Sequence, residues 1–259
     1  MWNPATYLQF QSERDRPFFD LLAQVGDLTP RTVIDLGCGT GHLTAALARR
    51  WPHARVTGID SSAQMLAAAS SEPHLLPNLH FVQADLRAWR APQAPDLLVS
   101  NAALQWVPGH EHLIPQLATQ VAPGGTFAFQ VPANFAAPSH TLLQRLCVSE
   151  RWHGQLADLE QQRAALSDLA AERYVGLLAP LGFAVNAWET SYLHLLSGPD
   201  AVLEWTRGTA LRPVLTRLDT EDAAEFERDY AALLRLAYPE QPYGTPFPFR
   251  RVFVVARRT

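Results

Sequence analysis

The 259-residue chain has the composition of a globular protein with a substantial core, because 47 % of its residues are hydrophobic and 18 % are charged. Its net charge of −4 argues against an extended basic surface for nucleic acid, and no apolar run approaches the roughly 20 residues that a membrane helix needs. All 21 basic residues are arginines, which excludes Schiff-base and general-base chemistry by lysine. Anion recognition therefore falls to arginine, histidine or backbone amides.

The cysteine content indicates the expected compartment. The chain contains only Cys38 and Cys147, too few for a disulfide framework, and neither belongs to a cluster with the spacing of metal ligands. The N-terminus also lacks the basic segment followed by an apolar segment of a secretion signal. We therefore expect a cytoplasmic protein with no metal site and no membrane or nucleic-acid partner.

Residues 1–30 are expected to form an N-terminal lid and a helix. Trp2, Tyr7 and Phe10 are large aromatic residues so close to the terminus that a frayed tail is disfavoured, although ordinary packing would also explain them. The helix is expected from about residue 13 to residue 25. The lid would fold back over the glycine-rich turn that follows.

That turn lies in the stretch Thr32–Gly41. A short apolar run containing Asp35 is followed by Gly37, Gly39 and Gly41, and then by an alanine- and leucine-rich helix. Glycines allow positive φ and leave no Cβ, so a ligand can lie directly against such a turn. The spacing differs from the dinucleotide fingerprint and from the lysine-containing phosphate loop. On its own, the turn is equally compatible with a purely structural role or another nucleotide site.

Polar side chains follow the next three predicted strands. Asp60 ends the second strand, where an acid can accept hydrogen bonds from both hydroxyls of a ribose, although it could instead cap the following helix. Asp85 comes just after the third strand and Asn101 just after the fourth. Because ligands of doubly wound folds bind outside the carboxyl ends of the strands, we expect these residues to share one site.

Strands alternate with helices over the first half of the chain, which predicts a parallel sheet covered on both faces. The strands are expected near 32–36, 55–59, 79–84, 95–100 and 125–131, and the helices near 41–51, 62–71 and 111–121. Later in the chain the pattern is helical from 138 to about 178 and from 199 to 238. Strands are expected over 183–193 and 249–256.

These motifs, in this order, resemble the class I S-adenosylmethionine-dependent methyltransferases. The resemblance implies a Rossmann-like α/β fold, with a seven-stranded, mostly parallel sheet, helices on both faces and a helical substrate cap. It also implies that the glycine turn binds the methionine and ribose parts of the cofactor, that Asp60 binds the ribose and that Asp85 binds the adenine amino group. The cofactor-binding residues implied for S-adenosyl-L-methionine are Asp35, Gly37, Gly39, Gly41, Asp60, Ser61, Met65, Asp85, Leu86 and Asn101.

The resemblance also divides the chain. Residues 31–135 would form the cofactor-binding core, and 181–196 and 247–259 would be its closing strands. Residues 136–180 would be a helical insertion, and 197–246 a helical cap over the substrate. The minimal family core has its two closing strands adjacent in sequence, so the long insertion between them is expected to set specificity.

Absent motifs narrow the class of acceptor. Amino methyltransferases that act on nucleic acid carry Asn/Asp-Pro-Pro-Tyr/Phe after the fourth strand, whereas this chain has Asn101-Ala102-Ala103-Leu104. The clustered acids of a catechol-type metal site are also missing at that position. A small-molecule acceptor is the remaining interpretation.

Motifs outside the core carry a closer resemblance. They are Trp2-Asn3-Pro4 with Tyr7-Leu8 and Phe10, Arg14 with Arg16-Pro17, Asn101 to Pro108, Leu211-Arg212-Pro213, and Phe249 with Arg251-Val252-Phe253. Together they resemble the trans-aconitate 2-methyltransferases over core and cap. The resemblance implies methyl transfer to one carboxylate of trans-aconitate, a small-molecule polycarboxylate. We expect the protein to act as a monomer.

Residues for that reaction follow from its chemistry. A carboxylate is already ionised at neutral pH, since free carboxyl groups titrate near ~4, so no general base is required. Arg212, Arg251 and Tyr7 are the candidate substrate-binding residues, and Tyr7, Gln105 and Trp106 would position the reacting groups. A solvated surface side chain remains the alternative for each arginine, and core packing for Trp106.

Three alternative functions stay open. The chain could methylate another small acid, or a hydroxyl group, which would need a base such as a histidine. It could bind S-adenosylmethionine without turnover. A dehydrogenase of the Rossmann type is less compatible with the glycine spacing.

Overall fold

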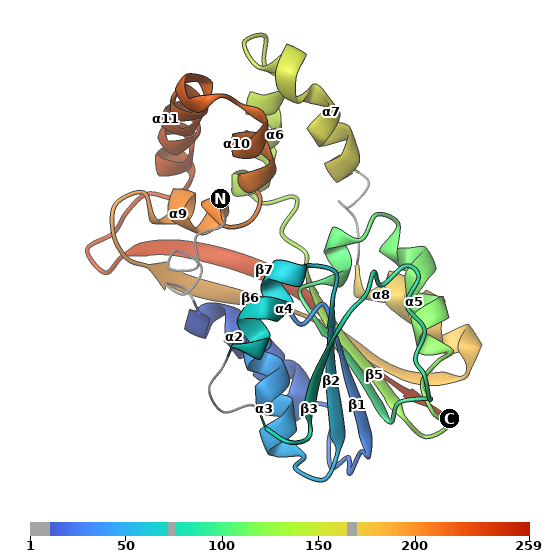
Figure 1. Cartoon of the computed structure of the whole chain (residues 1–259). Helices are drawn as coiled ribbons and strands as arrows, with labels where there is room; N and C mark the ends of the chain where they lie inside the picture. Colours follow the sequence, from blue (N-terminus) through green and yellow to red (C-terminus); the bar gives the residue numbers. More distant parts are fainter. Residues whose placement is uncertain (1–10, 72–75, 165–169) are drawn as a thin grey trace. The chain divides into compact units, whose positions relative to one another are not determined.

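The computed structural model describes residues 11–71, 76–164 and 170–259, and Figure 1 shows their course along the chain. Contacts divide the chain into two compact units. The sheet unit comprises Asp15–Pro132, Leu169–Thr190 and Arg251–Thr259. The helical unit includes Ala133–Asp168 and Ser191–Arg250.

The seven-stranded sheet expected from the sequence is confirmed, and its strand order is β3-β2-β1-β4-β5-β7-β6. The first five strands pair in parallel, and β7 pairs antiparallel with β5. The strands are β1 (Thr32–Leu36), β2 (Arg55–Asp60), β3 (Leu79–Gln83), β4 (Leu97–Asn101), β5 (Thr126–Pro132), β6 (Phe183–Leu196) and β7 (Thr245–Arg258).

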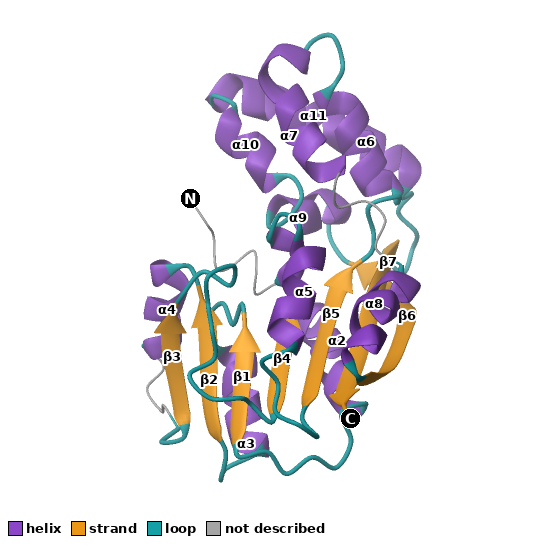
Figure 2. Ribbon diagram, turned by 90° about the vertical axis from the view of Figure 1, so that its right-hand side faces the viewer, coloured by secondary structure: helices purple, strands orange, loops and turns teal. Residues whose placement is uncertain are grey.

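Helices cover both faces of this sheet, and they bury its central strands. All five residues of β1 are buried, which explains why this strand is a continuous apolar run interrupted only by Asp35. Figure 2 shows α2 (Gln11–Ala23) and α3 (His42–Arg50) on one face, and α5 (His110–Ala118) and α8 (Ala171–Leu178) on the other. Helix α4 (Ala63–Ser70) packs against β2 and β3.

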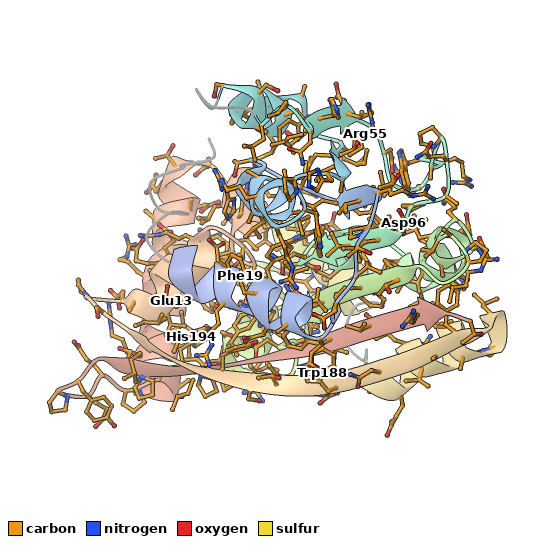
Figure 3. The ribbon with its side chains drawn as sticks, turned by 90° about the horizontal axis from the view of Figure 1, so that it is seen from below. Glu13, Phe19, Arg55, Asp96, Trp188 and His194 are labelled. Carbon is orange, nitrogen blue, oxygen red and sulfur yellow. The ribbon has the colours of Figure 1, made fainter. Side chains whose placement is uncertain are left out.

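Several strand boundaries differ from expectation, and β6 for example continues to Leu196. Strand β4 begins at Leu97, and the preceding Asp96 also uses its Oδ2 to accept the backbone N–H groups of Arg31 (2.7 Å) and Thr32 (3.0 Å). Figure 3 labels Asp96 at this end of the sheet. Strand β7 begins before the expected Phe249, although Pro246 and Pro248 lack an N–H.

The position of those prolines explains why they are tolerated. The register of β7 with β5 begins only at Arg251, opposite Pro132, so neither proline has to donate a hydrogen bond to β5. Within the sheet unit, β7 also packs against its other neighbour through a stacked pair, Trp188 of β6 and Phe253, whose ring centroids are 5.0 Å apart. Trp188 is labelled on β6 in Figure 3.

The helical unit has its own apolar core. Its helices are α6 (Pro138–Cys147), α7 (His153–Ala164), α9 (Ala201–Arg207), α10 (Arg212–Arg217) and α11 (Thr220–Ala237). Trp152 and Phe226 meet edge to face in this core, at a centroid distance of 5.3 Å. The hydroxyl of Tyr230 donates to the carbonyl of Ser139 (2.6 Å), and the Ser139 N–H donates to the hydroxyl of Tyr238 (3.0 Å). These bonds join α6 to α11.

A buried acid lies inside the sheet unit. Asp35 of β1 is 3 % exposed, and its Oδ2 accepts a hydrogen bond of 2.6 Å from the hydroxyl of Thr44 in α3. Burial raises the pKa of Asp35 to about 6, although the Thr44 hydrogen bond and His42 oppose the rise. The negative charge of Asp60 adds to the rise.

This pKa predicts a pH-dependent stability that Asp35→Asn should remove. The unfolded carboxyl titrates near ~4 and the folded one at about 6, so the folded state binds more protons in between. Stability from this group should therefore fall as the pH rises from about 4 to about 6, by roughly 2–3 kcal/mol. Urea unfolding measures the free energy of unfolding of both proteins at pH 4.5 and pH 8. The value for Asp35→Asn relative to that of the wild type should be higher at pH 8 than at pH 4.5. An equal difference at both pH values would contradict the prediction.

Candidate active site

The glycine turn between β1 and α3 has the conformation that its sequence predicts. Gly37, Gly39 and Gly41 have φ of 75°, 55° and 77°, in the region that favours glycine. A Cβ on Gly37 would lie 2.2 Å from the Cβ of Ala103, and one on Gly41 would lie 2.5 Å from the ring of Phe81. A Cβ on Gly39 would meet no atom within 4 Å. Two of the glycines thus allow close packing within the protein, and Gly39 leaves its face open to a ligand.

Asp60 faces this turn from the end of β2. Its Oδ2 accepts the N–H of Gly39 at 2.9 Å, and its Oδ1 accepts the N–H of Ser62 at 2.9 Å. Each oxygen of an ionised carboxylate has a second lone pair, so Asp60 retains capacity to accept two hydroxyl donors. The helix cap is a different residue, since the hydroxyl of Ser62 accepts the N–H of Met65 (3.3 Å) at the start of α4.

Three further residues were predicted to bind the cofactor, and they differ in exposure. Ser61 is exposed, and its carbonyl accepts a hydrogen bond from Gln83 (3.1 Å). Met65 is half-buried on α4. Leu86 is buried behind the loop that follows β3.

Asp85 is exposed and engaged by a residue that the sequence interpretation missed. Nε of Arg87 donates to both of its carboxylate oxygens, at 3.1 and 3.0 Å, and the Arg87 N–H donates to Oδ1. These hydrogen bonds lower the pKa of Asp85 to about 2. Asp85 is therefore an anion at neutral pH, and both of its oxygens already accept hydrogen bonds from Arg87. An arginine two residues away has the appearance of an ordinary solvated side chain, so the sequence offered no signal for this pairing.

A row of three side chains crosses the carboxyl edge of β4 and β5. Nη1 of Arg251 donates to Oε1 of Gln130 at 3.1 Å, and Nε2 of Gln130 donates to Oδ1 of Asn101 at 2.6 Å. Gln130 is fully buried and Arg251 is 4 % exposed, whereas Asn101 is half-buried. We call these three residues the amide row. It brings together two predicted site residues, one assigned to the cofactor and the other to the substrate.

Gln130 was not predicted from the sequence. The signal available was a single amide in an otherwise apolar strand, Thr126–Pro132, at the position paired with Asn101. A buried polar side chain in a central strand requires a hydrogen-bond partner, which is a reason to suspect it.

The turn after β4 holds the proposed positioning residues. Ala102 has φ of 50°, and its carbonyl accepts a hydrogen bond of 2.6 Å from Nε2 of Gln105. Gln105 is buried, and its Oε1 has no hydrogen-bond partner among the described residues. Trp106 is 60 % exposed, so its indole does not belong to the apolar core.

Arg212 and Tyr7 are the other two predicted substrate residues. Arg212 is exposed at the first position of α10 in the helical unit. Tyr7 lies outside the described residues. In the described part of the chain, no three histidine, cysteine, aspartate or glutamate side chains are grouped as metal ligands would be. The helices described there include none with the length and apolarity needed to cross a bilayer.

Comparisons with known proteins give the family. The family described as "Methyltransferase domain" matches residues 33–125. A trans-aconitate 2-methyltransferase of Streptomyces coelicolor is 51 % identical over 268 residues, covering 99 % of this chain and 86 % of that protein. A trans-aconitate 2-methyltransferase of Streptomyces avermitilis is 50 % identical over 262 residues, covering 99 % and 97 %.

A solved structure is similar in fold. The YcgJ protein of Bacillus subtilis has a TM-score of 0.60 at 15 % identity, covering 94 % of this chain and 98 % of that chain. This likeness confirms the Rossmann-like methyltransferase fold, and the two Streptomyces relatives extend over both the sheet unit and the helical unit. The chain therefore belongs to the trans-aconitate 2-methyltransferase family, whose methyl donor is S-adenosyl-L-methionine.

Proposed function

We propose that the protein transfers the methyl group of S-adenosylmethionine to one carboxylate of trans-aconitate. The names of the Streptomyces relatives support this substrate. The observation that carries the proposal is the buried guanidinium of Arg251, held by Gln130 at the edge of the sheet where the glycine turn also lies. A guanidinium suits bidentate binding of a carboxylate, the group that this reaction methylates.

The cofactor fits the carboxyl ends of β1 to β4. The open face of Gly39 accommodates its methionine and ribose parts, and the spare lone pairs of Asp60 accept the ribose hydroxyls. Asp85 accepts from the adenine amino group, and Leu86 forms part of the adenine site. When bound, the cofactor supplies an electrophilic methyl group on a sulfonium.

Arg212 is the second arginine proposed for the substrate. Arg212 is exposed and forms no ion pair with a described residue, whereas its neighbours Arg207 and Arg217 are paired with Glu227 and Asp158. We assign Arg212 to a second carboxylate of the substrate. Tyr7 would add a hydrogen bond from the N-terminal lid.

The reaction needs no general base. An ionised carboxylate oxygen attacks the methyl carbon while the carbon–sulfur bond breaks, and the electron pair of that bond stays on sulfur. The products are a methyl ester and S-adenosylhomocysteine, and no proton is transferred. The protein contributes the in-line orientation, which can supply several kcal/mol, with Gln105 and Trp106 as positioning residues.

Methyl transfer from labelled S-adenosylmethionine to a panel of acids tests this function. The panel contains trans-aconitate, cis-aconitate, isocitrate, citrate and a monocarboxylate. We expect rapid formation of a base-labile ester on trans-aconitate and little on the monocarboxylate, which lacks anions for the arginines. Cofactor binding without methyl transfer to any acid would overturn the assignment of the substrate. A search for a hydroxyl acceptor would then follow.

Asp60→Asn should weaken cofactor binding more than Asp85→Asn. An amide at position 60 replaces one acceptor oxygen with a donor next to the N–H groups of Gly39 and Ser62, and so loses hydrogen bonds to the ribose. We expect the Kd of S-adenosylmethionine to rise about 10- to 100-fold, which corresponds to about 1–3 kcal/mol. Asp85 is exposed, so its variant should change Kd less than about 5-fold. Calorimetry measures both, and the reverse ranking would contradict the assignment.

We expect Arg251→Met to raise the KM for trans-aconitate by about 100-fold, and Arg212→Ala to raise it by about 10-fold. Each substitution removes a charged hydrogen-bond donor for a carboxylate. The Kd of S-adenosylmethionine should stay within about 3-fold of the wild-type value. Arg217→Ala is the matched control, since Arg217 is exposed on the same helix and already pairs with Asp158 at 3.1 Å. Steady-state kinetics with both substrates tests these roles. An equal rise in the KM for trans-aconitate in Arg217→Ala and Arg212→Ala would contradict the role of Arg212.

A further inference from the structure

The turn after β4 contains a buried hydrogen-bond acceptor without a partner. Nε2 of Gln105 donates to the carbonyl of Ala102 at 2.6 Å, and Gln105 is 6 % exposed. Because a carbonyl can only accept, the atom that faces it must be the amide nitrogen, which identifies the other atom of the amide as the oxygen Oε1. In the part of the chain that the structure describes, nothing donates to Oε1. Burying an oxygen without a donor is costly, so this one calls for an explanation.

The same turn carries a second unfavourable feature, at Ala102. Its φ is 50°, in the left-handed region that favours glycine. Two hydrogen bonds hold this conformation, because the Ala102 N–H donates to the carbonyl of Gln130 at 3.0 Å and the Ala102 carbonyl accepts from Gln105. Strained backbone of this kind is concentrated at active sites and ligand-binding sites. The strain at Ala102 and the unpartnered oxygen of Gln105 therefore both indicate that the turn binds a ligand.

The neighbouring glycine turn identifies which ligand is in reach. A Cβ on Gly37 would lie 2.2 Å from the Cβ of Ala103, so the turns after β1 and β4 are in contact within the sheet unit. The cofactor has three kinds of donor: the adenine amino group, the ribose hydroxyls and the ammonium group. The proposed function places the adenine at Asp85, after β3, and the ribose at Asp60, at the end of β2. Because the strand order is β3-β2-β1-β4, the methionine end of the cofactor then reaches β1 and β4.

Other acceptors of the turn are already occupied. The carbonyl groups of residues 102–104 each accept a hydrogen bond from within the turn, and Oδ1 of Asn101 accepts from Gln130 at 2.6 Å. Oε1 of Gln105 has both of its lone pairs available. The proposed substrate cannot supply the missing donor, because its carboxyl groups are ionised at neutral pH and only accept.

We infer that Oε1 of Gln105 accepts a hydrogen bond from the ammonium group of S-adenosylmethionine. The inference rests on the cofactor contacts given under the proposed function, and it makes Gln105 a cofactor-binding residue. A hydrogen bond from a charged donor is stronger than one between neutral groups. Nε2 of Gln105 fixes the amide to Ala102, so the contact holds the methionine end of the cofactor and orients the methyl group for transfer.

A pair of ligands separates this contact from a structural role of Gln105. The ligands are S-adenosylhomocysteine and its deamino analogue, in which hydrogen replaces the amino group. Calorimetry should show that Gln105→Met raises the Kd of S-adenosylhomocysteine about 10- to 100-fold and that of the analogue less than about 3-fold. If Gln105 only supports the turn, or if Oε1 binds an internal water, the two Kd values should rise by the same factor.

Gln105→Lys adds a variant for which the two roles predict opposite results. Lysine keeps a donor for the Ala102 carbonyl, but it replaces the acceptor with a second positive charge beside the ammonium. We expect the Kd of S-adenosylhomocysteine to rise more in Gln105→Lys than in Gln105→Met, to at least about 100-fold. A structural role predicts the reverse order, because lysine retains the bond to Ala102.

Gln83→Met is the matched control. Gln83 is exposed, and its Nε2 also donates to a backbone carbonyl, that of Ser61, at 3.1 Å. This substitution removes the same kind of hydrogen bond on the other side of the glycine turn. It should change the two Kd values by the same factor, and a selective loss of S-adenosylhomocysteine binding would contradict the inference.

These measurements contain no acceptor acid, so they distinguish failure of the inference from failure of the proposed function. Equal loss of both ligands in Gln105→Met, or loss of all binding, would overturn the inference, while methyl transfer to trans-aconitate by the wild type would still support the proposed function. Selective loss in Gln105→Met without transfer to any acid by the wild type would uphold the inference and overturn the substrate. A wild type that binds neither ligand would overturn both.

Discussion

The antiparallel pairing of β7 with β5 is the constraint on which the candidate site depends. Parallel strands bring their carboxyl ends to one edge of a sheet, and an antiparallel neighbour brings residues from its own first half to that edge. Arg251 stands opposite Pro132, the last residue of β5, for this reason. Arg251, which is near the C-terminus of the chain, thus forms one end of the row whose other end is Asn101. If β7 were parallel to β5, Arg251 would lie at the amino edge of the sheet, away from Asn101.

The parts that the sequence predicted were those with local signals. Alternating apolar runs predicted the strands and the helices between them, because burial on both faces selects continuous apolar segments. The glycines of the turn were predicted as a ligand site, but their packing was not, since contacts such as Gly37 with Ala103 join residues far apart in the chain. The start of β7 was missed because Pro246 disfavours a strand unless its missing N–H faces no partner.

The partners of site residues were harder to predict than the residues themselves. Asp85 and Arg251 were identified from motifs, yet what each one touches follows from the fold. Arg87 fixes the charge of Asp85 through a local loop, and Gln130 holds Arg251 through strand register. Sequence spacing carries little information on such contacts, because the same residue types at the same positions are compatible with solvated side chains. The same limit applies to the buried Asp35, whose raised pKa depends on the helix that covers it.

The connectivity of the two units has a consequence for how this family diversifies. The chain passes between the two units after Arg14, after Pro132, after Asp168, and again within β6 and β7. The helical unit therefore consists of separate segments, and Ala133–Asp168 and Ser191–Arg250 are each flanked on both sides by segments of the sheet unit. Its core, around Trp152 and Phe226, is complete in itself, so substitutions there are buffered from the sheet. An exchange of the helical unit between relatives would therefore need crossings at several points of the chain, and none of these crossings falls within the apolar core around Trp152 and Phe226.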